Sequence, residues 1–151
     1  MQIHAMPGHL IRCLNQISVG VFAEHMAQAD IRLTPVQFAA LSAVAEHPDI
    51  DQARVAGLIA YGRATLGKVI DKLEARGLVL RRTSPTDRRA KVMRLTPAGH
   101  DLLTRVIPIV AALQSEITAG LDAEERAVFL GLLEKVTLVG NDHSRAPLKP
   151  L

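Results

Sequence analysis

The sequence predicts a mainly helical protein with a small β-hairpin, and three observations support this fold class. Aliphatic residues provide most of the 48% hydrophobic content, since the 151 residues include no Trp, one Tyr and three Phe. Most apolar positions recur every three to four residues, which is the spacing of one helix face. Two short runs, 78–82 and 91–95, instead have the composition of strands. A chain of this length is expected to form one domain over 1–151.

The first half of the chain is predicted to begin with three helices. Residues 9–29 carry apolar side chains along one helix face, so a long first helix is expected there. Thr34 and Pro35 supply an N-cap and a first-turn proline for a second helix, which Pro48 ends. Asp51 can cap a short third helix.

The third and fourth helices are predicted to form a helix-turn-helix. Only Ala60, Tyr61 and Gly62 separate them, and a short turn with a glycine is typical of this motif. The fourth helix is expected to end at Gly77, and its apolar residues share one face. On the opposite face Gly67 would allow close approach to the base edges of a DNA major groove. This outer face contains Arg63, Ala64, Thr65, Gly67, Lys68 and Lys72.

The segment after the fourth helix is predicted to form a wing. The strands 78–82 and 91–95 flank a stretch from Ser84 to Asp87 that has the residue types of a turn, and the tip between them is basic. Thr96 then begins a long helix that contains Pro108. Because proline has no backbone N–H, we expect either a kink there or a position where the helix does not need this hydrogen-bond donor.

The C-terminal part is predicted to hold one more helix and a tail. Asp122 with Glu125 forms a capping-box pattern at the start of the last helix. Beyond it, Pro147 and Pro150 indicate a frayed tail over 141–151.

The distribution of charge points to a polyanionic partner. The net charge is only +3, but residues 63–94 hold ten of the 18 Lys and Arg against three acidic residues, a local balance of +7. Lys and Arg concentrated in this way gain free energy by displacing counterions from nucleic-acid phosphates.

The residue patterns argue against an enzyme, a metal site, a cofactor or a membrane protein. The six His are scattered without metal-ligand spacing, and no serine lies in a nucleophile-elbow pattern. The apolar runs are too short to span a bilayer, and no signal-peptide pattern is present. The single Cys13 excludes an internal disulfide and fits a reducing compartment, so a cytoplasmic protein is expected.

Three stretches of the sequence resemble the MarR family of winged-helix regulators: 73–79, 87–91 and 94–99, the last two containing an Asp-x-Arg wing followed by Leu-Thr-x-x-Gly. This resemblance implies a homodimeric transcription regulator that is not an enzyme. Its dimerisation helices would lie at 8–32 and 98–140, and its winged helix-turn-helix lobe at 34–96. It would bind a pseudo-palindromic double-stranded DNA operator whose half-site centres lie about 10 bp apart.

The resemblance also implies roles for individual residues at the DNA. The fourth helix would place five residues at base edges and nearby phosphates, and Lys72 is expected to contact a phosphate. Arg89, helped by Arg88, would enter the minor groove, where A·T-rich sequences attract arginine. Asp87 would orient the wing arginines by an ion pair, and Arg81 or Arg82 would contact the backbone. The five helix residues are Arg63, Ala64, Thr65, Gly67 and Lys68. One departure from the family is Gly62, where Ser or Asp would be a better helix cap.

Two signals are considered for the regulator. Many members of the family bind a small aromatic acid or phenol and then release DNA. Residues 7–12 and 33–38 of this chain resemble members that regulate the catabolism of aromatic or nicotinate-type acids. Arg12 is the best carboxylate partner because its planar fork donates two parallel hydrogen bonds. The candidate ligand residues are His9, Arg12, Asn15, Gln16, Gln37 and Phe38. The alternative is oxidant sensing through Cys13, whose pKa a protonated His9 would lower; an inert, buried Cys13 is favoured over it.

A different class of function is also consistent with the fold. A winged helix can serve as a scaffold for protein interaction without binding DNA. That alternative predicts no salt-dependent binding to any duplex, whereas a repressor predicts strong salt dependence.

Overall fold

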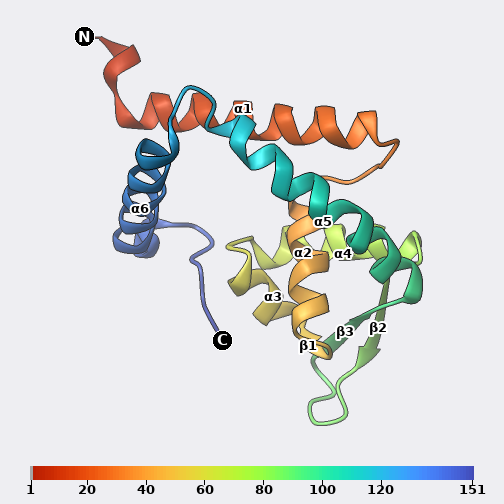
Figure 1. Ribbon diagram of the computed structural model, residues 1–151. Coiled ribbons are helices and arrows are strands. Elements are labelled where there is room, and N and C mark those ends of the chain that lie inside the picture. The colour runs from red at the N-terminus through yellow and green to blue at the C-terminus, as the bar shows by residue number, and fades with distance from the viewer. Residues whose placement is uncertain (1) are drawn as a thin grey trace.

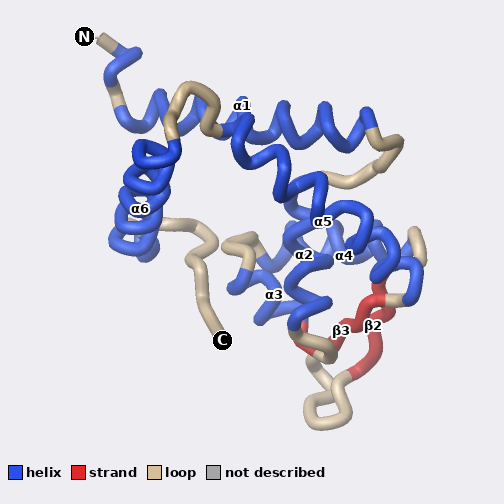
Figure 2. The backbone as a smooth tube through the Cα atoms, in the orientation of Figure 1, coloured by secondary structure: helices blue, strands red, loops and turns tan. Residues whose placement is uncertain are grey.

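The computed structural model describes residues 2–151 and shows a mainly helical chain with one small antiparallel sheet (Figures 1 and 2), which confirms the predicted fold class. In chain order the elements are η1 Ile3–Ala5, α1 Pro7–Gln28, α2 Pro35–Glu46, β1 Ile50–Asp51, α3 Gln52–Leu58, α4 Arg63–Ala75, β2 Val79–Thr83, β3 Lys91–Leu95, α5 Pro97–Ile117, α6 Ala123–Val139 and η2 Asn141–His143. No helix within this range is long and apolar enough to cross a membrane.

The helix starts follow from side-chain caps. Thr34 accepts a hydrogen bond from the Gln37 backbone while the Gln37 side chain accepts one from the Thr34 backbone, which makes a complete capping box for α2. Asp122 and Glu125 form the same box for α6, as predicted. Asp51 caps α3 through the Arg54 backbone. These caps occupy backbone donors that a helix leaves unpaired in its first turn.

The sheet has three strands in the order β1-β3-β2, all antiparallel. The predicted hairpin corresponds to β2 and β3, paired from Val79 opposite Leu95 to Thr83 opposite Lys91. The prediction missed β1, in which Ile50 lies opposite Met93. With two residues, β1 is too short to show the alternating pattern by which a strand is recognised.

The helix-turn-helix and the sheet enclose the main core. Leu41 of α2, Leu66 and Ile70 of α4, and Met93 of β3 are completely buried against one another. Val106 of α5 joins the same cluster, so the winged lobe is attached to α5 by apolar packing. Figure 1 shows α5 between this lobe and α1.

The long terminal helices pack differently. α5 crosses beneath α1 and contacts it, and His25 of α1 lies 2.8 Å from Glu116 of α5 (Figure 1). α6 stands to one side, and none of its residues is buried. Its apolar residues are mostly open to solvent, with Leu132 and Val136 being 56% and 62% exposed.

The segment expected to be frayed, 141–151, has defined contacts in the structure. The side chain of Asn141 both donates to the Leu148 carbonyl and accepts from the Leu148 amide, at 2.9 and 2.8 Å. The Lys149 amide donates to the Gly57 carbonyl at 2.8 Å. The chain after α6 therefore returns to α3 instead of leaving the molecule (Figure 1).

Candidate nucleic-acid interface

The outer face of α4 is open to solvent. Arg63, Ala64, Thr65 and Lys68 are all exposed, whereas Leu66 on the opposite face is completely buried. Lys72 continues the exposed face. The helix therefore presents small and cationic side chains at its N-terminal end while its apolar stripe holds it in the core.

At the start of α4, Gly62 departs from the family pattern but still occupies the N-cap. Gly62 occupies the N-cap in extended backbone conformation and supplies no side-chain cap. The turn before it depends on Ala60, which has a positive φ of 50°. Four residues, 59–62, separate α3 from α4, one more than the predicted three, because α3 ends at Leu58.

Gly67 faces the side chain of Gln52 on α3. It is half-buried, and a Cβ built there would lie 3.2 Å from Nε2 of Gln52. A side chain at position 67 would therefore require a small shift of the flexible end of Gln52. Gln52 also lies on the concave surface near the wing, and the sequence interpretation did not include it.

The wing turn is held by two side chains. Oγ of Ser84 accepts hydrogen bonds from the Thr86 and Asp87 amides, both at 3.3 Å. Oδ1 of Asp87 accepts from the Arg89 amide at 2.9 Å. The predicted ion pair between Asp87 and the wing arginines is absent from the part of the chain that the structure describes. Asp87 shapes the turn through the backbone instead, as Asp commonly does two residues ahead in a turn.

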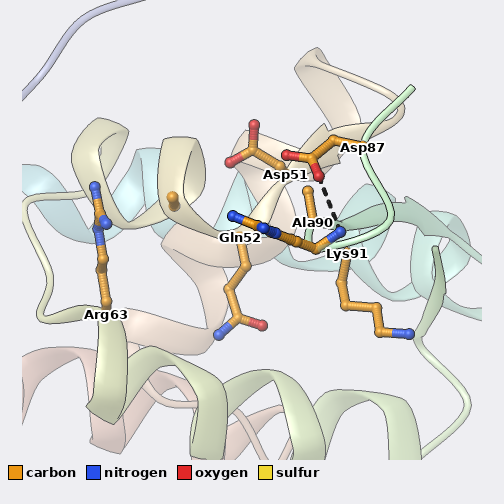
Figure 3. Close-up of a pocket in the computed structure, with 8 residues that line it drawn as sticks. Asp51, Gln52, Arg63, Asp87, Ala90 and Lys91 are labelled. Carbon is orange, nitrogen blue, oxygen red and sulfur yellow. Dashed lines mark hydrogen bonds between the residues drawn. The ribbon is translucent and has the colours of Figure 1, made fainter. Parts of the chain in front are cut away.

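A groove of about 340 Å³ separates the wing from the helix-turn-helix (Figure 3). Arg63 of α4 borders it on one side, and Asp87, Ala90 and Lys91 border it on the other, with Gln52 between them. Arg89 also lines this groove. The side chains predicted to read DNA from two separate elements therefore meet at one concave surface.

Arg81 is engaged within the protein. Its Nη2 lies 2.6 Å from Asp71 and its Nε lies 2.6 Å from Glu74, both on α4. Partial burial opposes ionisation, but the hydrogen bonds to Asp71 and Glu74 prevail and raise the pKa of Arg81. The guanidinium thus connects β2 to the recognition helix through its Nε and Nη2 donors.

Arg82 is also paired, and its partner is a residue that the sequence interpretation missed. Asp49, in the loop between α2 and β1, receives hydrogen bonds from Arg94 of β3 and from Arg82 of β2, the latter at 2.9 Å. Its own amide donates to the Met93 carbonyl at 2.9 Å, and its φ is +65°. The hydrogen bond from Arg94, reinforced by Arg82, lowers the pKa of Asp49 to about 2. Asp49 therefore fastens both wing strands to the loop that precedes the helix-turn-helix.

Six cations on this face remain available for a partner. Within residues 2–151 they form no ion pair, and all are exposed. They are Arg63, Lys68, Lys72, Arg88, Arg89 and Lys91. The basic residues concentrated in this part of the sequence thus fall into two groups. Arg81, Arg82 and Arg94 form ion pairs within the protein, whereas the exposed cations named above do not.

The candidate ligand residues lie in two groups. On α1, Nδ1 of His9 lies 3.4 Å from Arg12 and Nε2 of His9 lies 3.5 Å from Sγ of Cys13. Asn15 and Gln16 are exposed on the same helix.

The other two candidates lie on α2 and have structural partners. Gln37 uses its side-chain oxygen in the capping box with Thr34. Phe38 stacks at a tilt on Phe22, with 6.3 Å between ring centroids. Gln37 and Phe38 therefore already contribute to the packing of the lobe.

Comparison with known proteins agrees with this geometry. The MarR family model matches residues 33–91, which cover the helix-turn-helix and most of the wing. The repressor NicR of Pseudomonas putida is 33% identical over 129 residues, spanning 85% of this chain and 80% of NicR. The chain belongs to the MarR family.

Other relatives of this MarR-family chain are regulators as well. A putative regulatory protein for the hcr operon of Thauera aromatica is 34% identical over 69% of this chain, which spans 63% of that protein's length. BpsR of Bordetella bronchiseptica, whose DNA binding is regulated by 6-hydroxynicotinic acid, superposes with a TM-score of 0.84 at 30% identity, covering 91% of this chain and 96% of BpsR. Because the relatives are transcription regulators, the expectation that this chain is not an enzyme is confirmed.

Solved MarR-family complexes show both kinds of partner. The PcaV regulator of Streptomyces coelicolor, in complex with its natural ligand, has a TM-score of 0.83 at 30% identity, covering 91% of this chain and 95% of PcaV. A mutant of Escherichia coli MarR complexed with operator DNA has a TM-score of 0.78 at 28% identity, covering 85% of this chain and 91% of that one. This chain is thus a DNA-binding regulator of the MarR type.

Proposed function

We propose that this chain is a homodimeric repressor that binds a pseudo-palindromic DNA operator and releases it when a small aromatic acid binds. The observation that carries the proposal is the groove between the helix-turn-helix and the wing, where Arg63 and Arg89 face a common surface. An exposed helix with small side chains fits a major groove, and an arginine at a wing tip fits the adjacent minor groove.

Individual roles follow from this arrangement. Thr65 and Lys68 on the exposed face of α4 would contact base edges. Arg63 and Ala64 would lie where the helix enters the DNA major groove. Lys72 would contact a phosphate. Arg88 and Arg89 would approach the minor groove. Arg81 and Arg82 would fix the wing, since both guanidinium groups are already paired with carboxylates of the protein.

The homodimer is supported by the apolar residues on the terminal helices. α6 buries none of its own residues, and Leu132, Val136 and Leu138 are each more than half exposed. A soluble monomer rarely leaves such a patch open. A second copy of the chain, packed against α1, α5 and α6, would cover it and place two α4 helices on the same side of the DNA.

A small aromatic carboxylate is the proposed effector. The relatives support it, since BpsR responds to 6-hydroxynicotinic acid. In this chain Arg12 is exposed beside His9, so its guanidinium can receive a carboxylate. Thermal-shift measurements with a panel of such acids should show stabilisation, because a ligand that binds the folded state raises its apparent stability. The absence of a shift across the panel would contradict the effector, while leaving DNA binding intact.

The replacement Arg89→Ala tests the DNA-binding mode. We expect operator affinity to fall by about 1–3 kcal/mol, the usual effect of losing a groove contact. Fluorescence anisotropy on an operator fragment, together with a random duplex of the same length, measures it. Arg105→Ala on α5 is the control, since it removes the same side chain from an exposed site outside the lobe. Equal isotherms for Arg89→Ala and the parent would rule out the proposed minor-groove contact.

A further inference from the structure

The last residues of the chain form a second cationic surface beside the recognition helix. After α6 the chain turns back, and its end lies next to α3 in Figure 1. A hollow of about 270 Å³ there is lined by the turn of the helix-turn-helix and by three cations, Arg63, Arg145 and Lys149. Arg63 thus borders both this hollow and the groove that faces the wing.

The position of Lys149 is fixed by backbone contacts. Its amide donates to the Gly57 carbonyl at 2.8 Å, and its Cβ lies 3.0 Å from where a Cβ would stand on Gly57. Leu148, the residue before Lys149, is held as well, because the Asn141 side chain makes two hydrogen bonds to its backbone. The glycine and the asparagine together hold this part of the tail against α3, while the Lys149 side chain stays exposed.

The charges around the hollow are all of one sign. None of its lining residues is acidic, and in the described part of the chain neither Arg145 nor Lys149 forms an ion pair. The groove on the wing side differs, because Asp51 and Asp87 line it together with its cations. Three like charges around one hollow repel one another until an anion enters.

We infer that Arg63, Arg145 and Lys149 bind neighbouring phosphates of the DNA backbone, so that the C-terminal tail is a third DNA-contacting element besides α4 and the wing. The inference rests on the proposed DNA-binding function, because it requires α4 to lie in a groove. Arg63, as the first residue of α4, connects the groove-reading helix to this phosphate site. The tail contributes two cations that do not read sequence, so it raises affinity for every duplex.

Salt dependence of DNA binding by the full chain tests the inference. The logarithm of the affinity falls with the logarithm of salt concentration by about 0.9 for each phosphate neutralised. We expect Lys149→Gln to reduce this slope by about 0.9 for each chain bound. Between about 50 and 200 mM salt, the parent should therefore lose roughly three- to fourfold more affinity per chain than the variant does. Lys149→Arg should retain the parent slope.

Two further variants separate charge from position. Asn141→Ala keeps every cation but removes both hydrogen bonds to Leu148, so it should reduce the slope nearly as much as Lys149→Gln. Lys135→Gln removes a charge from exposed α6 and should leave the slope unchanged. An unchanged slope in Asn141→Ala would overturn the proposed role of the ordered tail.

The outcomes distinguish this inference from the proposed function. If the parent binds duplexes and Lys149→Gln has the parent slope, the phosphate site is wrong and the repressor proposal stands. If the parent itself shows no salt-dependent duplex binding, the proposed function fails. A free-anion site is tested with inorganic phosphate against chloride at equal ionic strength. Thermal stabilisation by phosphate that is lost in Lys149→Gln, combined with an unchanged slope, would assign the hollow to a free anion and overturn the DNA contact.

Discussion

The winged lobe and the terminal helices differ in how completely one chain buries their apolar residues. In the lobe, Leu41, Leu66 and Met93 have no exposed surface. On α6, in contrast, Leu138 and Val139 are 72% and 78% exposed. Since apolar burial is the main favourable contribution to folding, the lobe can be stable on its own contacts, while the terminal helices need a partner surface.

The boundary between the part with buried apolar residues and the part with exposed ones falls inside α1. Its second half contributes Phe22 and Met26 to the core. Its first half leaves Leu10, Ile11 and Ile17 about half exposed. One continuous helix therefore belongs to the lobe at one end and to the proposed dimer interface at the other, which provides a rigid mechanical connection between the two.

The largest expected effect comes from adding a methyl group at the base of α5. Gly99 is buried, and a Cβ there would overlap the Leu78 carbonyl oxygen, a backbone atom that cannot move away alone. We expect Gly99→Ala to destabilise folding by about 3 kcal/mol or more, as severe overpacking does. The same change at Gly131 on α6 meets no atom within 4 Å and should stabilise its helix by about 0.5–1 kcal/mol. Urea unfolding measures the change in unfolding free energy for both variants. Equal changes would contradict the contrast between a tightly packed lobe and an α6 helix whose surface is exposed.

The next effect concerns the open faces. Leu132→Glu places a charge on the exposed apolar face of α6. If a second copy buries this face, we expect dimer affinity to weaken by about 1.5–3 kcal/mol per leucine lost, together with operator affinity. Sedimentation velocity at several concentrations measures the dimer. Glu134→Gln on the same helix is the control. A parent chain that is monomeric at all concentrations would disprove the dimer.

The sequence predicted those features whose causes are local. The N-cap at Thr34 and the capping box of Asp122 with Glu125 depend on residues close together in the chain, so the sequence shows them; the pairing of Thr34 with Gln37 was not predicted. The helix-turn-helix and the hairpin followed from periodicity and turn residues in the same way.

The features that were missed join residues far apart in the chain. Asp49 meets Arg82 and Arg94 across 33 and 45 residues, and no spacing rule reports such a pair. Strand β1 exists only because β3 lies beside it. The predicted ion pair of Asp87 was wrong for a different reason. Donors on the backbone and on side chains compete for the same carboxylate, and in this turn it accepts from the Arg89 amide.

The smallest predicted effect is a pH dependence confined to the lobe. The pKa of Asp49 is about 2 in the folded protein, below its ordinary value of 3.8, so its ionised form stabilises the fold at higher pH. This contribution is present above pH 3.8 and is lost as the pH falls through about 2. Asp49→Asn should therefore unfold at lower urea than the parent at neutral pH, and the difference should narrow across that window. Because the clamp is partly exposed, solvent screening keeps the effect small.

The matched control for this titration is Asp142→Asn, in the tail. Asp142 is exposed, and among residues 2–151 it forms no ion pair. Its replacement should leave the urea midpoint close to that of the parent at every pH. If Asp49→Asn behaved in the same way, the bonds from Arg82 and Arg94 would carry no net stability. The wing would then be held by its strand pairing and by the ion pairs of Arg81 with Asp71 and Glu74, without a contribution from Asp49.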